Sequence, residues 1–117
     1  MRHDILFHIT TREVFSEFKN SNSYEPESIE AEGFIHCSGG DQLNETANRL
    51  FANQPKILLL VINVSTLRPE VKYELDEETG QKFPHIYGPL NKDSIIDKID
   101  IQAEEDGSFD ISFKSYS

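Results

Sequence analysis

The sequence predicts an α+β protein with mostly antiparallel β-sheets and two or three short helices in its N-terminal half. Helical apolar spacing occurs only in the first half of the 117 residues. The second half consists of alternating or continuous apolar segments separated by turn-forming residues, a pattern typical of strands. No repeat or linker interrupts the chain, so we expect residues 1–117 to form a single domain.

The first predicted elements are a strand and a short helix. Residues 4–10 carry apolar side chains on both faces, which predicts a strand in the centre of a sheet. A helix is expected next, because a Thr can cap it and Glu13 lies at the capping-box offset from Thr10. Its predicted apolar stripe consists of Val14, Phe15 and Phe18.

Two further helices and a strand are expected before residue 54. Pro26 at the start and Gly33 at the stop predict a helix over residues 26–32, followed by a strand over residues 34–37. Asp41 is suited to cap a third helix over about residues 42–53. Its expected buried stripe contains Leu43, Ala47, Leu50 and Phe51.

The second half reads as strands joined by turns. Residues 56–64 are almost continuously apolar and β-branched, which predicts a fully buried strand. Further strands are expected over residues 71–75, 83–87 and 94–101. A hairpin turn is expected at residues 104–107, with Phe109, Ile111 and Phe113 on the inward face of a last strand.

Charge restricts the classes of partner. Eleven basic and twenty-one acidic residues give a net charge of −10. Such a surface repels phosphate backbones and anionic lipid, so we expect neither extended nucleic acid nor a membrane as partner. A small anionic nucleotide remains compatible, because backbone N–H groups and one Arg can bind phosphate locally. The sequence specifies no protein partner.

The remaining composition predicts a cytoplasmic protein. No apolar run approaches the roughly 20 residues that span a membrane. The N-terminal residues do not resemble a signal peptide. The single Cys37 cannot form an internal disulfide, which fits a reducing compartment.

Three histidines share one frame of histidine, apolar residue and hydroxyl residue. These are His8-Ile9-Thr10, His36-Cys37-Ser38 and His85-Ile86-Tyr87. In a strand, residues i and i+2 lie on one face and i+1 on the other. Each frame therefore exposes a histidine and a hydroxyl together, and three of them predict the lining of one pocket. Cys37 should point away from His36, which argues against a Cys–His nucleophile.

Structural interpretations of the same residues remain open. His8 can be a semi-buried histidine that bonds a neighbouring carbonyl, with Thr10 only a helix cap. Ser38 can belong to an ordinary turn, and residues 83–89 can be a rigid edge strand between two prolines. Glu74 is either a general base on the pocket face or a solvent-facing strand residue. A three-histidine zinc site is the competing function, but the spacing matches no helical metal motif, so no metal is predicted.

The segments that carry the three frames resemble a known family. They are Ile5–Thr10, Glu32–Ser38 and Phe83–Leu90, together with a helix at residues 47–51 and a strand at residues 58–64. In combination they are similar to the bacterial family catalogued as domain of unknown function 952. The resemblance covers roughly residues 5–101.

The resemblance implies the ADP-ribosyltransferase fold, a split-sheet architecture that binds NAD in a cleft. NAD is the implied cofactor, and ADP-ribosyl transfer or NAD glycohydrolysis is the implied reaction. His36 and Glu74 would be catalytic, with Glu74 stabilising an oxocarbenium-like state. The nucleotide would be bound by His8, Thr10, Ser38, His85 and Tyr87. RNA 2′-phosphate is not an expected substrate, because the chain has only four arginines.

Two other functions are compatible with the same residues. The first is a non-catalytic ligand- or protein-binding module that keeps the fold without the chemistry. The second is a metal-dependent hydrolase. Release of nicotinamide distinguishes the enzyme from the module, and metal content after purification tests the hydrolase.

Overall fold

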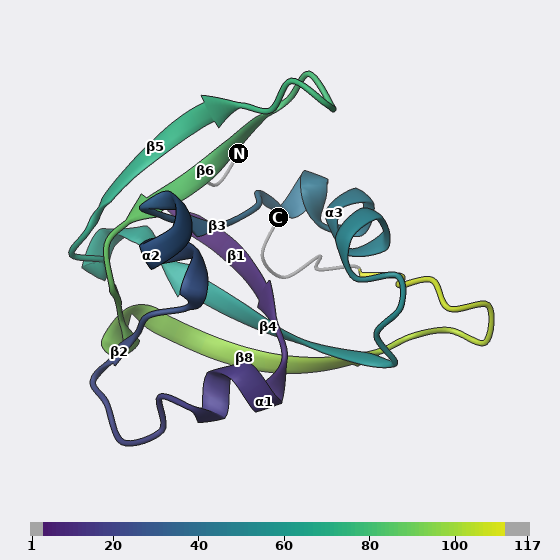
Figure 1. Ribbon diagram of the computed structural model, residues 1–117, viewed down its shortest axis with the longest axis horizontal. Coiled ribbons are helices and arrows are strands. Elements are labelled where there is room, and N and C mark those ends of the chain that lie inside the picture. The colour runs from purple at the N-terminus through teal and green to yellow at the C-terminus, as the bar shows by residue number, and fades with distance from the viewer. Residues whose placement is uncertain (1–3, 112–117) are drawn as a thin grey trace.

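The computed structural model describes residues 4–111, which form antiparallel sheets with short helices between them (Figure 1). The helices and strands, in chain order, are β1 (Ile5–Thr10), α1 (Arg12–Ser16), β2 (Ser23–Tyr24), α2 (Glu27–Glu32), β3 (Ile35–His36), α3 (Leu43–Leu50), β4 (Lys56–Asn63), β5 (Glu70–Leu75), β6 (Lys82–Tyr87), β7 (Leu90–Asn91) and β8 (Ile95–Gln102). The predicted α+β class with antiparallel pairing is confirmed. No helix of the described part is long and apolar enough to cross a membrane.

The largest sheet has the order β1-β4-β8, and β4 is its buried centre. Residues 57–62 are at most 1% exposed. Successive β4 side chains point to opposite faces, so Ile57, Leu59 and Val61 enter one core cluster. Leu58, Leu60 and Ile62 enter the other. The continuous apolar run therefore fills two cores, as its sequence predicts.

A second sheet has the order β3-β6-β5, which places β6 in the middle. The interpretation of residues 83–89 as an edge strand is therefore wrong. Pro84 fits a central strand because β3 is only two residues long. The Pro84 carbonyl accepts from Cys37 N at 3.0 Å, on the side of β3. The N–H that Pro84 lacks would point to that same side, where the β3 ladder has already ended.

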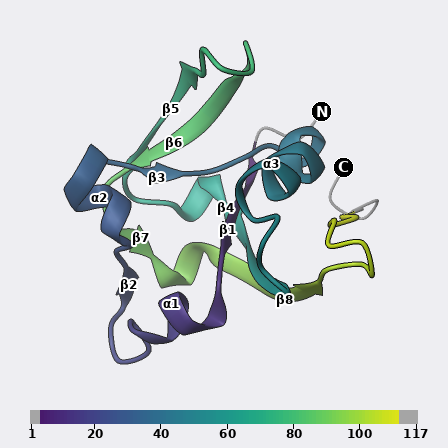
Figure 2. The same cartoon turned by 45° about the vertical axis from the view of Figure 1, so that its right-hand side comes forward.

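The two sheets touch through a single backbone bridge and then separate. Phe7 N donates to Ser38 O at 2.9 Å, and Ser38 N donates to Phe7 O at 2.7 Å. Figure 2 shows β3, β5 and β6 as a layer apart from β1, β4 and β8. β1 is thus an edge strand, although its sequence predicts a central one. All six of its residues are buried because both of its faces are covered.

The helices form where the sequence predicts them, but their predicted ends need correction. Asp41 does not cap α3: it lies inside a 3₁₀ turn over Gly40–Gln42, and Gln42 is the N-cap of α3. α1 is capped by Thr11, whose Oγ1 accepts from Val14 N, and not by Thr10. Gly33 ends α2 with a φ of 91°, which a side chain would strain. α3 ends at Leu50, earlier than expected, and Leu50 is 57% exposed instead of buried.

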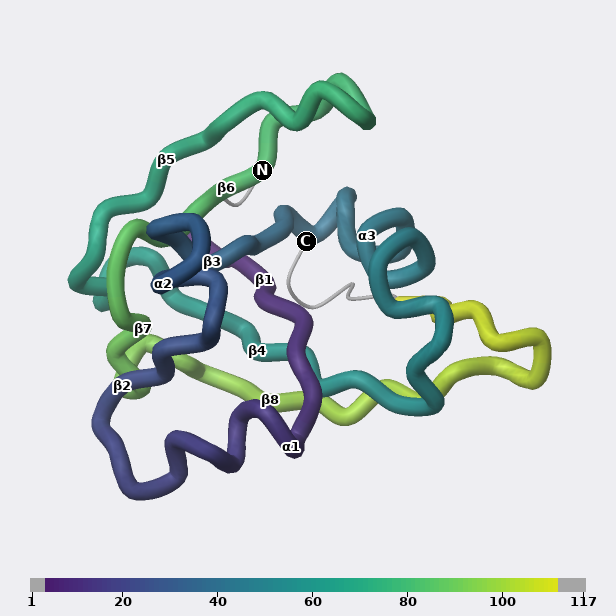
Figure 3. The backbone as a smooth tube through the Cα atoms, viewed as in Figure 1, coloured from purple at the N-terminus to yellow at the C-terminus, as the bar shows by residue number. Residues whose placement is uncertain are grey.

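The predicted last strand does not form within the described residues. After the turn at residues 104–107, the chain returns along α3 without pairing to β8 (Figure 3). Phe109 and Ile111 are buried as expected. Their backbone N–H groups donate to the side-chain oxygens of Asn48 and Asn44, at 2.7 and 2.5 Å. Phe113 lies outside the described residues.

Candidate functional site

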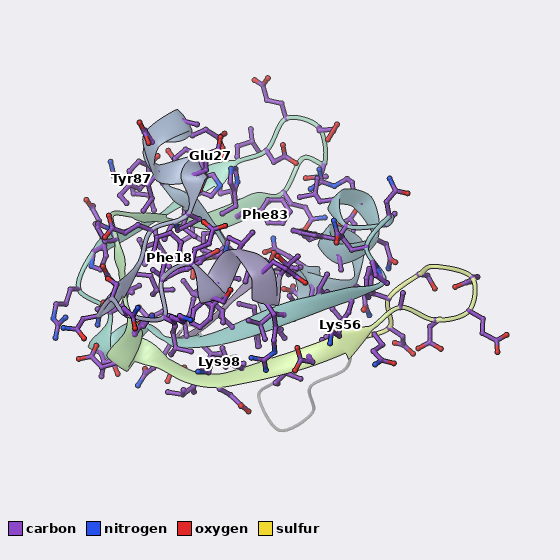
Figure 4. The ribbon with its side chains drawn as sticks, turned by 60° about the horizontal axis from the view of Figure 1, so that its bottom comes forward. Phe18, Glu27, Lys56, Phe83, Tyr87 and Lys98 are labelled. Carbon is purple, nitrogen blue, oxygen red and sulfur yellow. The ribbon has the colours of Figure 1, made fainter. Side chains whose placement is uncertain are left out.

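A cleft of about 580 Å³ opens where β1 and the second sheet separate. It has the size of a typical small-molecule site. Five of the seven predicted site residues line it, namely His8, Thr10, His36, Ser38 and His85. Glu74 and Tyr87 are not among the lining residues. Figure 4 shows Phe83, which lines the cleft, and Tyr87 at opposite ends of β6.

Residues that the sequence analysis missed complete the walls. Thr46, Arg49 and Leu50 present one face of α3 to the cleft, at the i, i+3, i+4 spacing of a helical face. Of these three residues, only Leu50 belongs to the predicted buried stripe, and the spacing of Thr46 and Arg49 beside it is the signal that the sequence offers. Val14 of α1 and Leu75 of β5 also line the cleft, and with Leu50 they are exposed large apolar side chains.

A buried hydrogen-bond network forms the floor of the cleft. The His8 Nδ1 lies 2.6 Å from His36 O, and its Nε2 lies 3.0 Å from the Tyr24 hydroxyl. The Tyr24 and Thr10 hydroxyl oxygens are 3.0 Å apart. Burial lowers the pKa of His8 to about 4, so the ring is neutral at neutral pH.

The neutral ring fixes the direction of the network. A carbonyl only accepts, so His8 Nδ1 carries the proton and donates to His36 O. Nε2 must then accept from the Tyr24 hydroxyl, and Tyr24 in turn accepts from Thr10. Burial raises the pKa of Tyr24 to about 12, so it keeps its proton. The carbonyl-bonded interpretation of His8 is therefore the observed one, but Thr10 bonds Tyr24 instead of capping α1.

His8 also explains why the sheet splits. From the Phe7–Ser38 bridge, an antiparallel ladder would next pair Ile9 with His36. The His8 ring takes the His36 carbonyl instead. Backbone groups of residues i and i+2 point to the same strand edge, so Ile9 N–H and C=O face away from β4, as those of Phe7 do. Ile9 lines the cleft, which places a backbone donor and acceptor at its edge.

His85 is held from behind by Glu74. Its Nδ1 lies 2.7 Å from Glu74 Oε1, and the same oxygen accepts from the Tyr87 hydroxyl. The hydrogen bonds from Tyr87 and His85 lower the pKa of Glu74, which is therefore a carboxylate. The bond to that carboxylate raises the pKa of Tyr87. Phe34 stacks on the His85 ring, with 4.1 Å between centroids and 12° between planes.

His36 and Ser38 occupy different environments at the cleft. The His36 side chain is half exposed, and its Nε2 lies 2.8 Å from Glu32 Oε2. Its ring centroid is 5.2 Å from that of His85. Ser38 is buried, and its Oγ donates weakly to Thr46 Oγ1 at 3.4 Å.

Cys37 lies in a core cluster, as its position in the frame predicts. Burial raises the pKa of its thiol, which suppresses the reactive thiolate. Among residues 4–111, no group of three or more His, Cys, Asp and Glu side chains is arranged to hold a metal ion.

Arg49 is the one Lys or Arg among the described residues that line the cleft. Its guanidinium lies 3.0 Å from Glu78 and 3.9 Å from Asp76, both on the β5–β6 turn. The Glu78 side chain is exposed and the Asp76 contact is long, so both pairs are weak. An anionic ligand group can compete for Arg49 at small cost.

Solved structures resemble this fold along most of its length. The crystal structure of protein CC0527 from Caulobacter crescentus gives a TM-score of 0.80 at 30% identity, covering 91% of this chain and 93% of that one. The solution NMR structure of CC0527 gives a TM-score of 0.76 at 30% identity, covering 90% of each chain. No curated protein matches the sequence. The model of the DUF952 family, described as a protein of unknown function, matches residues 9–98. The chain therefore belongs to the DUF952 family.

Proposed function

We propose that this protein binds NAD or an ADP-ribose-type nucleotide in the cleft, on an ADP-ribosyltransferase-like split sheet. The observation that carries the proposal is the convergence of the three histidine frames. Side chains from β1, from the segment around β3 and from β6 line one cleft of about 580 Å³. A nucleotide fits the size range of such a cleft.

The edge of β1 suits a carboxamide. Ile9 presents a backbone N–H and a C=O side by side on the edge that faces the cleft. The nicotinamide carboxamide carries one acceptor and one donor of the same kinds. It can therefore add to the strand edge as another strand would.

The cleft walls suit a planar base and a phosphate. Phe51, Phe83, Leu50 and Leu75 supply apolar surface against which an aromatic ring can stack. Arg49 can exchange its weak pair with Glu78 for a diphosphate oxygen, to which guanidinium binds more strongly. These contacts allow the cleft to bind an anionic nucleotide although the chain carries a net charge of −10.

One placement favours a binding module as the second candidate function. Glu74, the proposed catalytic carboxylate, is outside the cleft lining and is occupied by Tyr87 and His85. It therefore reaches a ligand only through His85. Nicotinamide release over a long incubation separates the two candidates. An enzyme releases nicotinamide and loses this activity in His36→Ala, whereas a module binds NAD without releasing it.

Binding is tested by titrating NAD and ADP-ribose into the labelled protein and following backbone amide signals. We expect shifts at Ile9, His36, Ser38 and His85, and none at the turn of residues 104–107. No shift around the three histidines at millimolar ligand would falsify the proposal.

A pair of arginine variants tests the phosphate contact. Arg49→Gln should weaken ADP-ribose binding about tenfold, the loss expected for one charge-assisted hydrogen bond. Arg68→Gln is the matched control, because Arg68 pairs with Asp93 and does not line the cleft. Equal effects of both variants would attribute the loss to net charge alone.

A further inference from the structure

The unit formed by Glu74 and His85 constrains the chemistry of the cleft beyond what binding requires. Glu74 Oε1 lies 2.7 Å from His85 Nδ1. A carboxylate can only accept, so in the neutral imidazole the proton is on Nδ1. His85 Nε2 then carries a lone pair and is a hydrogen-bond acceptor.

The surroundings of His85 hold that nitrogen in a fixed place. Phe34 stacks nearly parallel to the ring at 4.1 Å, which sets its plane. Tyr87 donates to the same Glu74 oxygen, which sets the position of the carboxylate. The His85 side chain is 14% exposed and lines the cleft, whereas Glu74 does not. No hydrogen bond from Nε2 to another described residue is present.

Other histidines at the cleft do not offer the same group. Both His8 nitrogens are used within the floor, at 2.6 and 3.0 Å from their partners. His36 bonds Glu32 through Nε2 and leaves Nδ1 unused by the described residues, but its side chain is 52% exposed, against 14% for His85, so solvent competes for both nitrogens and the ring is not held in one place. Among the three frames, only the third combines a fixed ring with an unused nitrogen at the cleft.

We propose that Glu74 is a positioning residue that fixes the tautomer of His85, so that Nε2 accepts a hydrogen bond from a sugar hydroxyl of the ligand. This inference rests on the proposed function for the identity of the ligand. An acceptor at this position selects a hydroxyl donor and disfavours a phosphate oxygen, which is also an acceptor. The inferred contact places the ribose beside His85, and Arg49 then binds the phosphates.

The tautomer is measured on the ligand-free protein, by imidazole ¹⁵N NMR at pH 8. We expect the Nδ1–H form of His85 in the wild type and a substantial population of Nε2–H in Glu74→Ala. Glu70→Ala is the control. Glu70 is a carboxylate on the same strand, opposite Tyr87 in the register, but the His85 ring bonds Glu74 and not Glu70. Glu70→Ala should leave the tautomer unchanged. An Nε2–H signal in the wild type, or no change in Glu74→Ala, would overturn the inference.

The hydroxyl contact is measured with NAD and with NAD analogues that lack one ribose hydroxyl each. One analogue should bind the wild type about tenfold more weakly than NAD, the loss expected for one hydrogen bond. That penalty should vanish in His85→Ala and shrink in Glu74→Ala, while Glu70→Ala keeps it. A penalty that persists in His85→Ala, or no penalty with any analogue, overturns the inference while NAD binding stands. If NAD itself does not bind, the proposed function and the assigned hydroxyl contact both fail, and the tautomer measurement still decides the role of Glu74.

Discussion

The floor and the wall of the cleft use the same sequence frame in opposite ways. On the floor, His8 is buried and neutral, with both ring nitrogens bonded to protein groups. On the wall, His85 bonds Glu74 with one nitrogen and keeps the other for the cleft. The floor histidine therefore joins the two sheets, whereas the wall histidine is available to a ligand.

The difference arises from the partners and not from the frame. His8 bonds the His36 carbonyl, which has no partner on a described strand where the sheets separate, and the Tyr24 hydroxyl of β2. His85 meets a carboxylate from the neighbouring strand β5. A buried polar group must be satisfied, so the floor is expected to matter for stability and the wall for binding.

The largest expected effect is the loss of the floor histidine. His8→Ala leaves the Tyr24 hydroxyl and the His36 carbonyl without their shared partner and creates a cavity, so the free energy of unfolding should fall by about 3–5 kcal/mol. His85→Ala is the matched variant on the wall and should cost about 1 kcal/mol. Urea unfolding of both proteins measures the contrast. Equal losses would contradict the division of roles.

Acidification should destabilise the His8 network on the floor of the cleft at a higher pH than the Glu74–His85 pair on its wall. The pKa of His8 is about 4 in the folded protein, against an ordinary value of 6.5. Between these values the unfolded chain binds a proton that the folded protein does not, so stability is lost as pH falls through this window. We expect a loss of about 2 kcal/mol between pH 7 and pH 5, measured by urea unfolding. His8→Gln should flatten the profile; an unchanged profile would locate the effect elsewhere.

Removing one hydroxyl should have a smaller effect of the same kind. Tyr24→Phe deprives His8 Nε2 of its donor and Thr10 of its acceptor, which should cost about 1–2 kcal/mol. Tyr73→Phe is the control, since Tyr73 is 51% exposed and should change stability by less than about 0.5 kcal/mol. Thermal unfolding of the two variants compares them directly. A tolerated Tyr24→Phe would mean that the network does not need the phenol.

The smallest expected effect concerns the apolar mouth of the cleft. Leu50→Ser should change stability by less than about 0.5 kcal/mol, because Leu50 is 57% exposed. It should weaken NAD binding about fivefold through lost apolar contact. Ile96→Ser is the control, as Ile96 is 50% exposed on β8 and does not line the cleft. Calorimetric titration distinguishes them, and identical affinities would remove Leu50 from the binding surface.

Local patterns were sufficient for most of the elements. The continuous apolar run of β4 predicts its burial, because only a strand covered on both faces can accommodate it. Pro26 and Gly33 bracket α2, since the ring of Pro26 restricts its φ and Gly33 accommodates the positive φ that ends the helix. The alternation of β1 predicts a strand but not its place in the sheet. An edge strand covered on both faces has the same pattern as a central one.

The candidate site could be predicted only in part, for the same reason. The three frames predict which side chains share a face, because the period of a strand is two residues. They do not predict Tyr24, which comes from a separate strand, or Arg49, which lies on a helix outside its predicted buried stripe. The last predicted strand failed because Asn44 and Asn48 provide the hydrogen bonds that strand pairing would otherwise supply.

The sequence by itself determined the class of the fold, the burial of Cys37 and the three histidine–hydroxyl pairs. Each of these depends on the period of a strand or on the conformational limits of single residues. Only the tertiary structure decided which histidine is saturated and which keeps a free nitrogen. That distinction depends on whether a carbonyl, a phenol or a carboxylate lies within 3.0 Å of each ring, and those groups are 11 to 28 residues away in the chain.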